Sequence, residues 1–239
     1  MSDLADIRKT SGWHSRADRL TQIWQQCCDR LSIDPLLEYT SNRSEIDRVF
    51  KLLVTAYTQP DRHYHNLNHI YQIFVTLDRF SDLANPSAVY FAAWFHDFIY
   101  DPQAADNEIQ SARAAKDLLA NLGVSPATIE LVSSLILATE GHKIDPTDRD
   151  LCIFLDADLA ILGADPVIYQ AYQQSIRREY SWVSDTAYQI GRIRMLEHFL
   201  ARDRLYHTEL LFNELESIAR LNLEREIDFW SKECGKRKI

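Results

Sequence analysis

The sequence predicts an all-α protein of about ten to eleven helices. Glycine and proline, the residues that most often interrupt helices, number only 6 and 7 in 239 residues. Apolar side chains recur every three or four positions along most of the chain, which is the period of an amphipathic helix. No internal repeat, low-complexity linker or clear boundary divides the sequence. We therefore expect one domain over 1–239, with its core over about 61–165 and helical extensions over 15–58 and 165–232.

Two amphipathic helices are predicted in the N-terminal quarter of the chain. The first covers about 15–31, where apolar residues share one face of a helix. Pro35 separates it from the second helix, which is expected to begin near Asn42 or Ser44 and to end before Pro60.

The next two elements contain two histidines and an aspartate that can bind a metal. Asn66 suits an N-cap position, and the helix after it places His69 beside an apolar face. The run 88–100 is apolar all round, which indicates a buried helix or, for so short a run, a buried strand. His96 and Asp97 stand at the end of this run, where burial is costly unless the side chains are paired or bound to a ligand.

The remaining helices are predicted from capping and stop signals. The helix over 88–100 is expected to start with Asn85 as its cap and Pro86, and the next helix covers 107–122 before Gly123. A helix opened by Ser125 and Pro126 is expected to end at Gly141, and the one after it is capped by Thr147 with Asp150 in its first turn. The last three are opened by Asp165 and Pro166, opened by Ser184 and continuing to Leu200, and extended from Glu209 to Trp230.

Composition limits the partners that can be expected. The formal net charge is -9, from 26 basic and 35 acidic residues, so a nucleic acid polymer is not an expected partner. A small phosphorylated substrate remains compatible, because a local metal ion and one or two arginines outweigh a distant negative surface. The four cysteines form no C-x-x-C pair and the N-terminus resembles no signal peptide, which favours a cytoplasmic protein with reduced thiols. No run of about eighteen apolar residues is present, so no membrane association is expected, and the oligomeric state stays open.

A metal site is predicted from His69, His96, Asp97 and Asp158. Residues two apart on a helix point about 200° away from each other, so Asp156 and Asp158 are not expected to face the same way. Asp158 recurs with the apolar residues of its helix and is therefore expected to be the ligand, with Asp156 beside the ligands or at the surface. Two imidazoles and two carboxylates suit one divalent ion, which could be Mn, Fe, Co, Ni, Mg or Zn, with positions left for water or substrate.

Four segments together resemble a known family. They read R-x-Y-H-N-L-x-H, F-H-D-x-x-Y-D, D-N-E-x-x-S-A and D-L-A-I-L-G, and they resemble a bacterial subgroup of predicted metal-dependent phosphohydrolases in the HD-domain superfamily. The resemblance covers about 61–230, and it implies an HD-type helical domain whose H…HD…D ligands are His69, His96, Asp97 and Asp158. It also implies hydrolysis of a small phosphoester, such as a nucleotide, by a metal-activated water. The chain reads H-D-F-I-Y-D in place of the H-D-x-G-K form of cyclic-dinucleotide relatives, so the role of that lysine is not carried over. It also lacks a doubled histidine pair, which favours a single metal ion.

Four further side chains are candidates for catalysis. Asp101 and Glu108 follow the H-D pair and could orient a ligand histidine or accept a proton from the metal-activated water, although Glu108 equally suits a helix N-terminus. His65 lies four residues before His69, and His142 precedes the helix of Asp158. Either histidine could contact a phosphate or act as a general acid.

Substrate binding is assigned to nearby cations. Arg62 is the best candidate, because a guanidinium pairs with a phosphate through two hydrogen bonds. Lys143, Arg177 and Arg178 are weaker candidates, since a solvated helix face explains them equally well. His63 has no place on an apolar face and is expected at the surface.

Two other functions stay open. The chain could be a non-catalytic module that binds a metal or a nucleotide. It could also be a di-iron oxygenase, which would need His65, Asp101 or His142 to hold a second ion.

Overall fold

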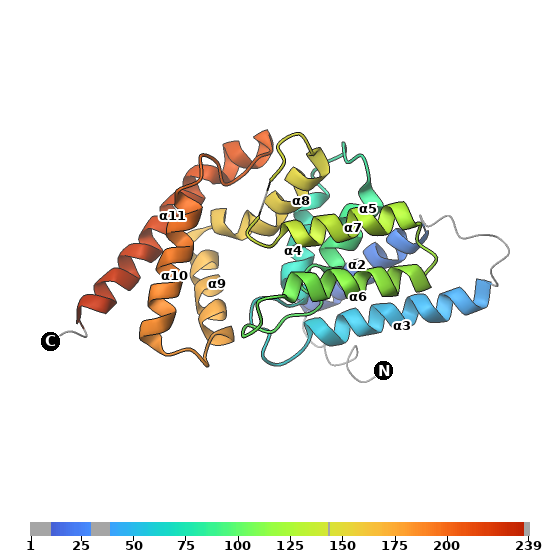
Figure 1. The fold of residues 1–239 in the computed structure, drawn as a ribbon, viewed down its shortest axis with the longest axis horizontal. Helices are drawn as coiled ribbons and strands as arrows, with labels where there is room; N and C mark the ends of the chain where they lie inside the picture. The colour runs from blue at the N-terminus through green and yellow to red at the C-terminus, as the bar shows by residue number, and fades with distance from the viewer. Residues whose placement is uncertain (1–10, 30–38, 143, 237–239) are drawn as a thin grey trace. The chain divides into compact units, whose positions relative to one another are not determined.

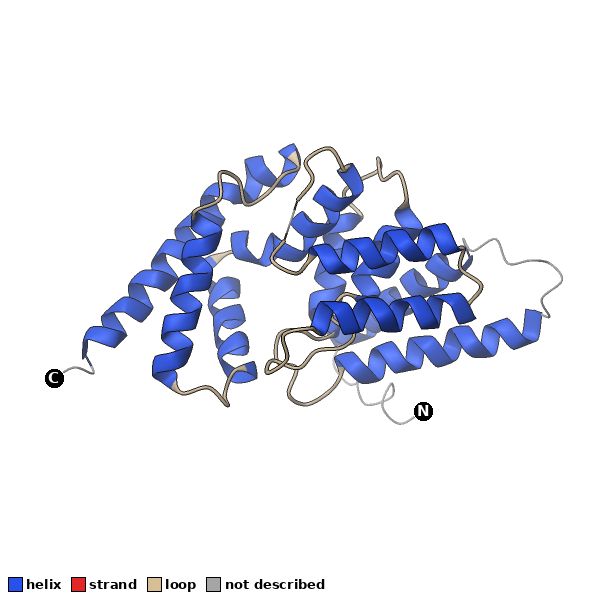
Figure 2. Ribbon diagram, viewed as in Figure 1, coloured by secondary structure: helices blue, strands red, loops and turns tan. Residues whose placement is uncertain are grey.

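The computed structural model describes residues 11–29, 39–142 and 144–236. Ten α-helices and one short 3-10 helix, with no strand, form the regular structure of these residues (Figure 2). This confirms the all-α fold and the number of helices expected from the sequence. No helix in the described part of the chain combines the length and apolar character needed to cross a membrane.

The helices belong to two compact units. The first unit takes the described parts of 1–58, 85–100 and 106–140, and the second takes 59–84, 101–105 and the described parts of 141–239. Segments of the two units alternate along the chain, which explains why the sequence contains no single boundary. The single HD-type domain over 1–239, with its core and extensions, stays a prediction.

The first unit is organised around a buried helix. Its helices are α2 (Ser11–Asp29), α3 (Tyr39–Tyr57), α5 (Pro86–Phe95), α6 (Asn107–Asn121) and α7 (Pro126–Ala138) (Figure 1). Helix α5 packs against α2, α6 and α7. The side chains of Phe91, Trp94 and Phe95 are completely buried, and all three rings contact Trp24 of α2. The run that is apolar all round is therefore a helix and not a strand, since every face of it meets another helix.

The second unit contains the remaining helices. They are α4 (Leu67–Leu77), α8 (Arg149–Leu159), η1 (Ala160–Gly163), α9 (Pro166–Glu179), α10 (Asp185–Leu200) and α11 (Glu209–Lys236) (Figure 1). Helix α4 packs on α8, while η1 and α10 pack on α11. Gly163 allows the close approach of η1 to α11, because a Cβ added there would lie 2.6 Å from the Cβ of Leu215. A buried ion pair links α10 to α11, with Nε of Arg192 2.8 Å from Oε1 of Glu226.

Three capping predictions are confirmed, and that of Thr147 is wrong; Asn85 occupies the N-cap position of α5 but its side chain makes no capping hydrogen bond. Asn66, Ser125 and Ser184 occupy N-cap positions and accept a hydrogen bond from a backbone N–H of the first turn. Helix α8 is capped by Asp148 and not by Thr147. The Asp148 carboxylate accepts a hydrogen bond from the N–H of Leu151, whereas Thr147 donates both its N–H and its hydroxyl to Asp145. The preceding turn therefore uses Thr147, and the next residue with a suitable side chain caps the helix.

Candidate metal centre

His69 is placed by the capped start of α4. The side chain of Asn66 accepts a hydrogen bond from the N–H of Asn68 at 2.9 Å and donates to the carbonyl of His63 at 3.0 Å. These contacts fix the loop before the helix and bring His69 into its first turn, where the residue is 5% exposed. His63 itself is exposed, as the sequence predicted.

His96 and Asp97 follow the buried helix α5. The Nδ1 atom of His96 lies 3.0 Å from the carbonyl oxygen of Ala93. A carbonyl can only accept, so Nδ1 carries this hydrogen and Nε2 is the ring atom that could serve as a metal ligand. Nε2 lies 3.0 Å from a carboxylate oxygen of Asp97.

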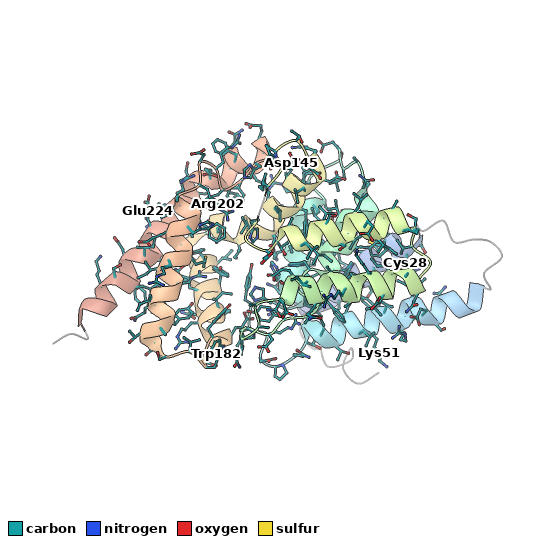
Figure 3. The ribbon with its side chains drawn as sticks, viewed as in Figure 1. Cys28, Lys51, Asp145, Trp182, Arg202 and Glu224 are labelled. Atoms are coloured by element: carbon teal, nitrogen blue, oxygen red, sulfur yellow. The ribbon has the colours of Figure 1, made fainter. Side chains whose placement is uncertain are left out.

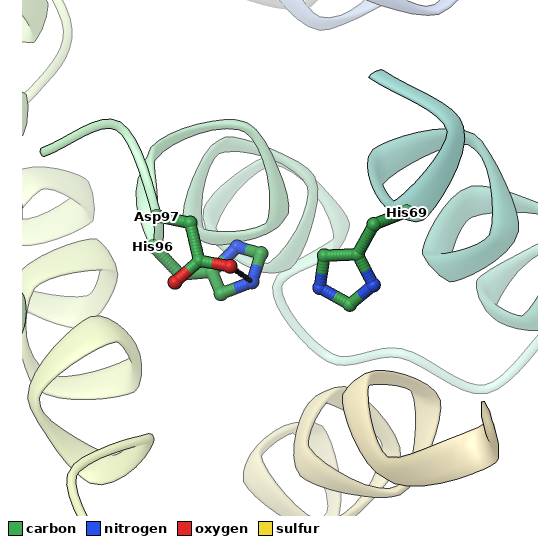
Figure 4. A group of neighbouring side chains, drawn as sticks. All are labelled: His69, His96 and Asp97. Atoms are coloured by element: carbon green, nitrogen blue, oxygen red, sulfur yellow. Dashed lines mark ion pairs between the residues drawn. The ribbon is translucent and has the colours of Figure 1, made fainter. Parts of the chain in front are cut away.

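These three side chains form a group that could hold a metal ion (Figure 4). One ligand atom from each of His69, His96 and Asp97 lies within 4.8 Å of the others. Around an octahedral ion with bonds of about 2.1 Å, neighbouring ligand atoms lie about 3 Å apart and opposite ones about 4 Å apart. The group therefore has donor types that could hold a divalent ion.

Asp158 lies next to this group through His69. Its Oδ1 atom is 3.1 Å from Nε2 of His69, and its Oδ2 atom is 3.0 Å from Nε2 of His142. His142 has a φ of +49°, directly after Gly141 at +72°. A left-handed conformation is unfavourable for histidine, and such strain is often found at functional sites. The carboxylate of Asp158 therefore contacts two imidazoles, one with each oxygen.

Asp156 was expected beside the ligands or at the surface, and the surface position is wrong. Its side chain is completely buried and accepts hydrogen bonds from the N–H groups of His207 at 2.8 Å and Thr208 at 2.7 Å. Burial raises the pKa of the Asp156 carboxyl, and these backbone donors only partly offset that effect. Asp156 therefore holds the segment that leads into α11. It is buried because α8 is buried on almost every side and not along one stripe.

His65 is held by a carboxylate that the sequence did not single out. Its Nδ1 atom lies 2.7 Å from Oε2 of Glu179, the last residue of α9. The ring of His65 also stands edge-to-face against that of His69, with centroids 5.9 Å apart. His65 therefore neighbours a candidate ligand, while its partner comes from a helix 114 positions away. A separation of that size leaves no local sequence signal.

The predicted acids after the H-D pair have local roles in the structure. Asp101 is exposed and accepts a hydrogen bond from the N–H of Gln103. Glu108 is half-buried in the first turn of α6, the position where a negative charge stabilises a helix. A catalytic role for either acid stays a prediction.

The predicted cations differ in their surroundings. Arg62 is 6% exposed and donates to the carbonyl of His65 at 3.3 Å. Arg177 donates to the carbonyls of Tyr180 and Val183 and to Asp185, so its guanidinium stabilises the turn between α9 and α10. Lys143 lies outside the described residues.

Arg202 is a further cation close to His142, and the sequence did not single it out. The guanidinium of Arg202, which is labelled in Figure 3, donates to the carbonyl of Gly141 at 2.8 Å. It also stacks on the ring of Phe199, and that ring contacts the imidazole of His142. Burial lowers the pKa of Arg202. The positive charge of Arg202 thus contacts the residue that precedes His142, the histidine that contacts Asp158.

Comparison of the chain with family models, with curated proteins and with solved structures found no match.

Proposed function

We propose that this protein is a metal-dependent phosphohydrolase of the HD-domain type that hydrolyses a small phosphoester, such as a nucleotide. The observation that supports it most strongly is the gathering of His69, His96 and Asp97 within 4.8 Å. These residues come from two segments whose motifs resemble that superfamily.

The proposed ligands are His69, His96, Asp97 and Asp158. Asp158 is included because its oxygen lies 3.1 Å from His69, the spacing of neighbouring ligand atoms on one ion. The same separation suits a hydrogen bond, so only metal binding itself distinguishes the two roles. A divalent ion held here would polarise a phosphoryl oxygen and lower the pKa of a bound water.

The residues around this group suit an anionic substrate. His65 and His142 each contact a proposed ligand, through the ring of His69 and the carboxylate of Asp158 respectively. Arg202 adds a positive charge beside His142. Arg62 also adds charge near His65, but its burial makes it a weaker candidate for direct contact with substrate.

The proposal is tested by metal content and turnover measured on the same preparations. The purified chain, loaded separately with Mn²⁺, Zn²⁺, Ni²⁺, Co²⁺, Fe²⁺ and Mg²⁺, is screened against mononucleotides, dinucleotides and sugar phosphates. His96→Ala and Asp97→Ala should lose both metal and hydrolysis. His63→Ala is the matched control, because it removes an exposed imidazole from the same region and should retain both.

Two outcomes would favour the other functions. A metal-loaded chain that hydrolyses nothing, yet melts at a higher temperature with a nucleotide, would be a binding module. The contact of His142 with the second oxygen of Asp158 is the one observation that favours a second ion. Two irons per chain by elemental analysis would support the di-iron oxygenase, whereas one ion per chain would count against it.

A further inference from the structure

Helix α11 carries a regular row of exposed side chains, called here the α11 row. Its members are Leu210, Glu214, Ile218, Leu221, Arg225 and Phe229. They follow one another at spacings of 4, 4, 3, 4 and 4 residues, which keeps them on one face of an α-helix. At a rise of about 1.5 Å per residue, the row extends over about 28 Å of helix.

Four members of the row are apolar and exposed. Leu210, Ile218, Leu221 and Phe229 are 37%, 39%, 44% and 56% exposed. Single exposed apolar residues are common on protein surfaces and need no explanation. Four of them along one face of one helix, separated only by one acid and one base, form a surface that burial against another helix would stabilise.

The other faces of α11 have different characters. Leu211, Ala219 and Leu223 are completely buried in the core that α11 shares with η1 and α10. The remaining exposed residues between Leu210 and Phe229 are all polar, and they are Asn213, Ser217, Glu224 and Asp228. The exposed apolar residues of this helix are therefore confined to the α11 row.

The row is symmetric about its midpoint, which directly follows Ala219. Ile218 and Leu221 are equally far from this midpoint, and so are Leu210 and Phe229. When two copies of the helix lie antiparallel about a two-fold axis at the midpoint, the two members of each pair reach the same level, one from each copy. Every apolar residue of the row then meets an apolar residue of the second copy.

The two charged members follow the same symmetry. Glu214 and Arg225 are equally far from the midpoint, so Glu214 of each copy reaches Arg225 of the other. Glu214 also lies 2.7 Å from a guanidinium nitrogen of Arg79 in its own chain, but its side chain is 46% exposed and a carboxylate accepts from several donors. Parallel helices would instead bring each charge against its own kind, so the charges favour the antiparallel arrangement.

We propose that the α11 row is the surface through which two copies of this chain form an antiparallel two-fold dimer. A membrane surface is a poorer partner, because Glu214, Glu224 and Asp228 lie on or beside the row and the formal net charge is -9. One helix pair buries a small area, so the dimer should be weak, with a dissociation constant of about 1–100 µM. The row contains no candidate metal ligand, so its test is independent of the proposed function.

Sedimentation equilibrium of the full chain tests the dimer. Between about 1 and 300 µM, the wild type should associate reversibly towards twice its mass of 27.8 kDa. Leu221→Glu and Arg225→Glu should each weaken association at least about 10-fold, by burying a charge and by opposing Glu214 with a second acid. Glu224→Arg is the matched control, since it reverses a charge beside the row on the same helix (Figure 3), and it should associate as the wild type does.

Mixing two variants tests the register of the pair. Arg225→Glu sets two acids opposite each other in its own dimer, and Glu214→Arg sets two bases opposite each other. In a dimer of one chain of each variant, every acid of the row again faces a base. With Arg225→Glu carrying a fluorescent label, the mixture should sediment as a dimer under conditions where each variant alone is a monomer.

Three results would overturn the inference. They are a wild type that stays monomeric over the whole range, a dimer that Leu221→Glu and Arg225→Glu leave intact, and a mixture that forms no dimer. Circular dichroism of each variant, equal to that of the wild type, establishes that the loss of association is not a loss of folding. All the substituted side chains are exposed, so we expect this equality.

Discussion

Two aspartates on one helix should separate metal binding from folding. Asp156 and Asp158 are two residues apart on α8, but Asp156 accepts backbone hydrogen bonds from His207 and Thr208, whereas Asp158 contacts two imidazoles. We expect Asp156→Ala to destabilise the chain and keep the metal. We expect Asp158→Ala to lose the metal and remain folded.

The size of each effect follows from burial. Asp156→Ala leaves the N–H of Thr208, which is buried, and that of His207, which is partly buried, without their acceptor. Each unsatisfied buried donor costs about 1–3 kcal/mol, so the loss should be roughly 2–4 kcal/mol. For a chain of this length that corresponds to a fall in Tm of about 5–15 °C. Asp158 has a partly exposed side chain, and its loss should weaken metal binding by more than the roughly 10- to 100-fold of a supporting residue.

The assay pairs elemental analysis after dialysis with thermal unfolding in the presence and absence of a chelator. Asp156→Asn should fall between wild type and Asp156→Ala in stability, because its amide oxygen can still accept one of the hydrogen bonds. Retained metal in Asp158→Ala together with metal loss in Asp156→Ala would refute the assignment of these two residues.

Three further predictions concern stability. Burial acts to raise the pKa of Glu179, but its hydrogen bonds with His65 and with the N–H of Tyr64 lower that pKa from 4.5 to about 2. The stability that this carboxylate contributes should therefore be complete above pH 4.5 and be lost as the pH falls towards 2. In urea unfolding from pH 2 to 6, Glu179→Gln should therefore lose less free energy of unfolding on acidification than the wild type. Arg192→Met should cost about 3–5 kcal/mol in urea unfolding, because it leaves the buried carboxylate of Glu226 without its cationic partner. Adding Glu226→Leu should recover much of this loss, and equal losses in both variants would contradict the reasoning. Gly163→Ala should cost about 1–3 kcal/mol through the contact of its Cβ with Leu215, and a Tm equal to that of the wild type would show that η1 can move away.

The features that the sequence predicted correctly are those set by neighbouring residues. The apolar run of α5 identified a buried helix, and Asn66, Ser125 and Ser184 were identified as caps from their residue types and positions. Helix limits were less accurate, since α2 begins at Ser11 and α11 continues to Lys236. The predicted cap of α8 was wrong because two adjacent residues, Thr147 and Asp148, both suit the N-cap position.

Periodicity failed for Asp156 because it assumes that a helix has one buried face. Helix α8 is buried from Asp150 to Ala157, so a carboxylate on any side of it meets protein and not water. An inward-facing Asp158 therefore does not require Asp156 to lie at the surface. What distinguishes the two residues is their partners, and those of Asp156 lie about 50 residues further along the chain.

Buried acids in the second unit mostly hold loops, and this clarifies which of them suit chemistry. Asp150, Asp156 and Glu216 all accept hydrogen bonds from backbone N–H groups outside their own helices. A sequence reader sees each as a possible catalytic carboxylate, because residue type alone does not show whether its partner is a backbone donor. Glu179 belongs to the same set by its contacts with Tyr64 and His65 N–H, but it also binds an imidazole ring. A backbone N–H has one fixed hydrogen, whereas a neutral imidazole has two possible tautomers. Of the partners of these four acids, the imidazole bound by Glu179 is therefore the one whose chemistry a carboxylate can change.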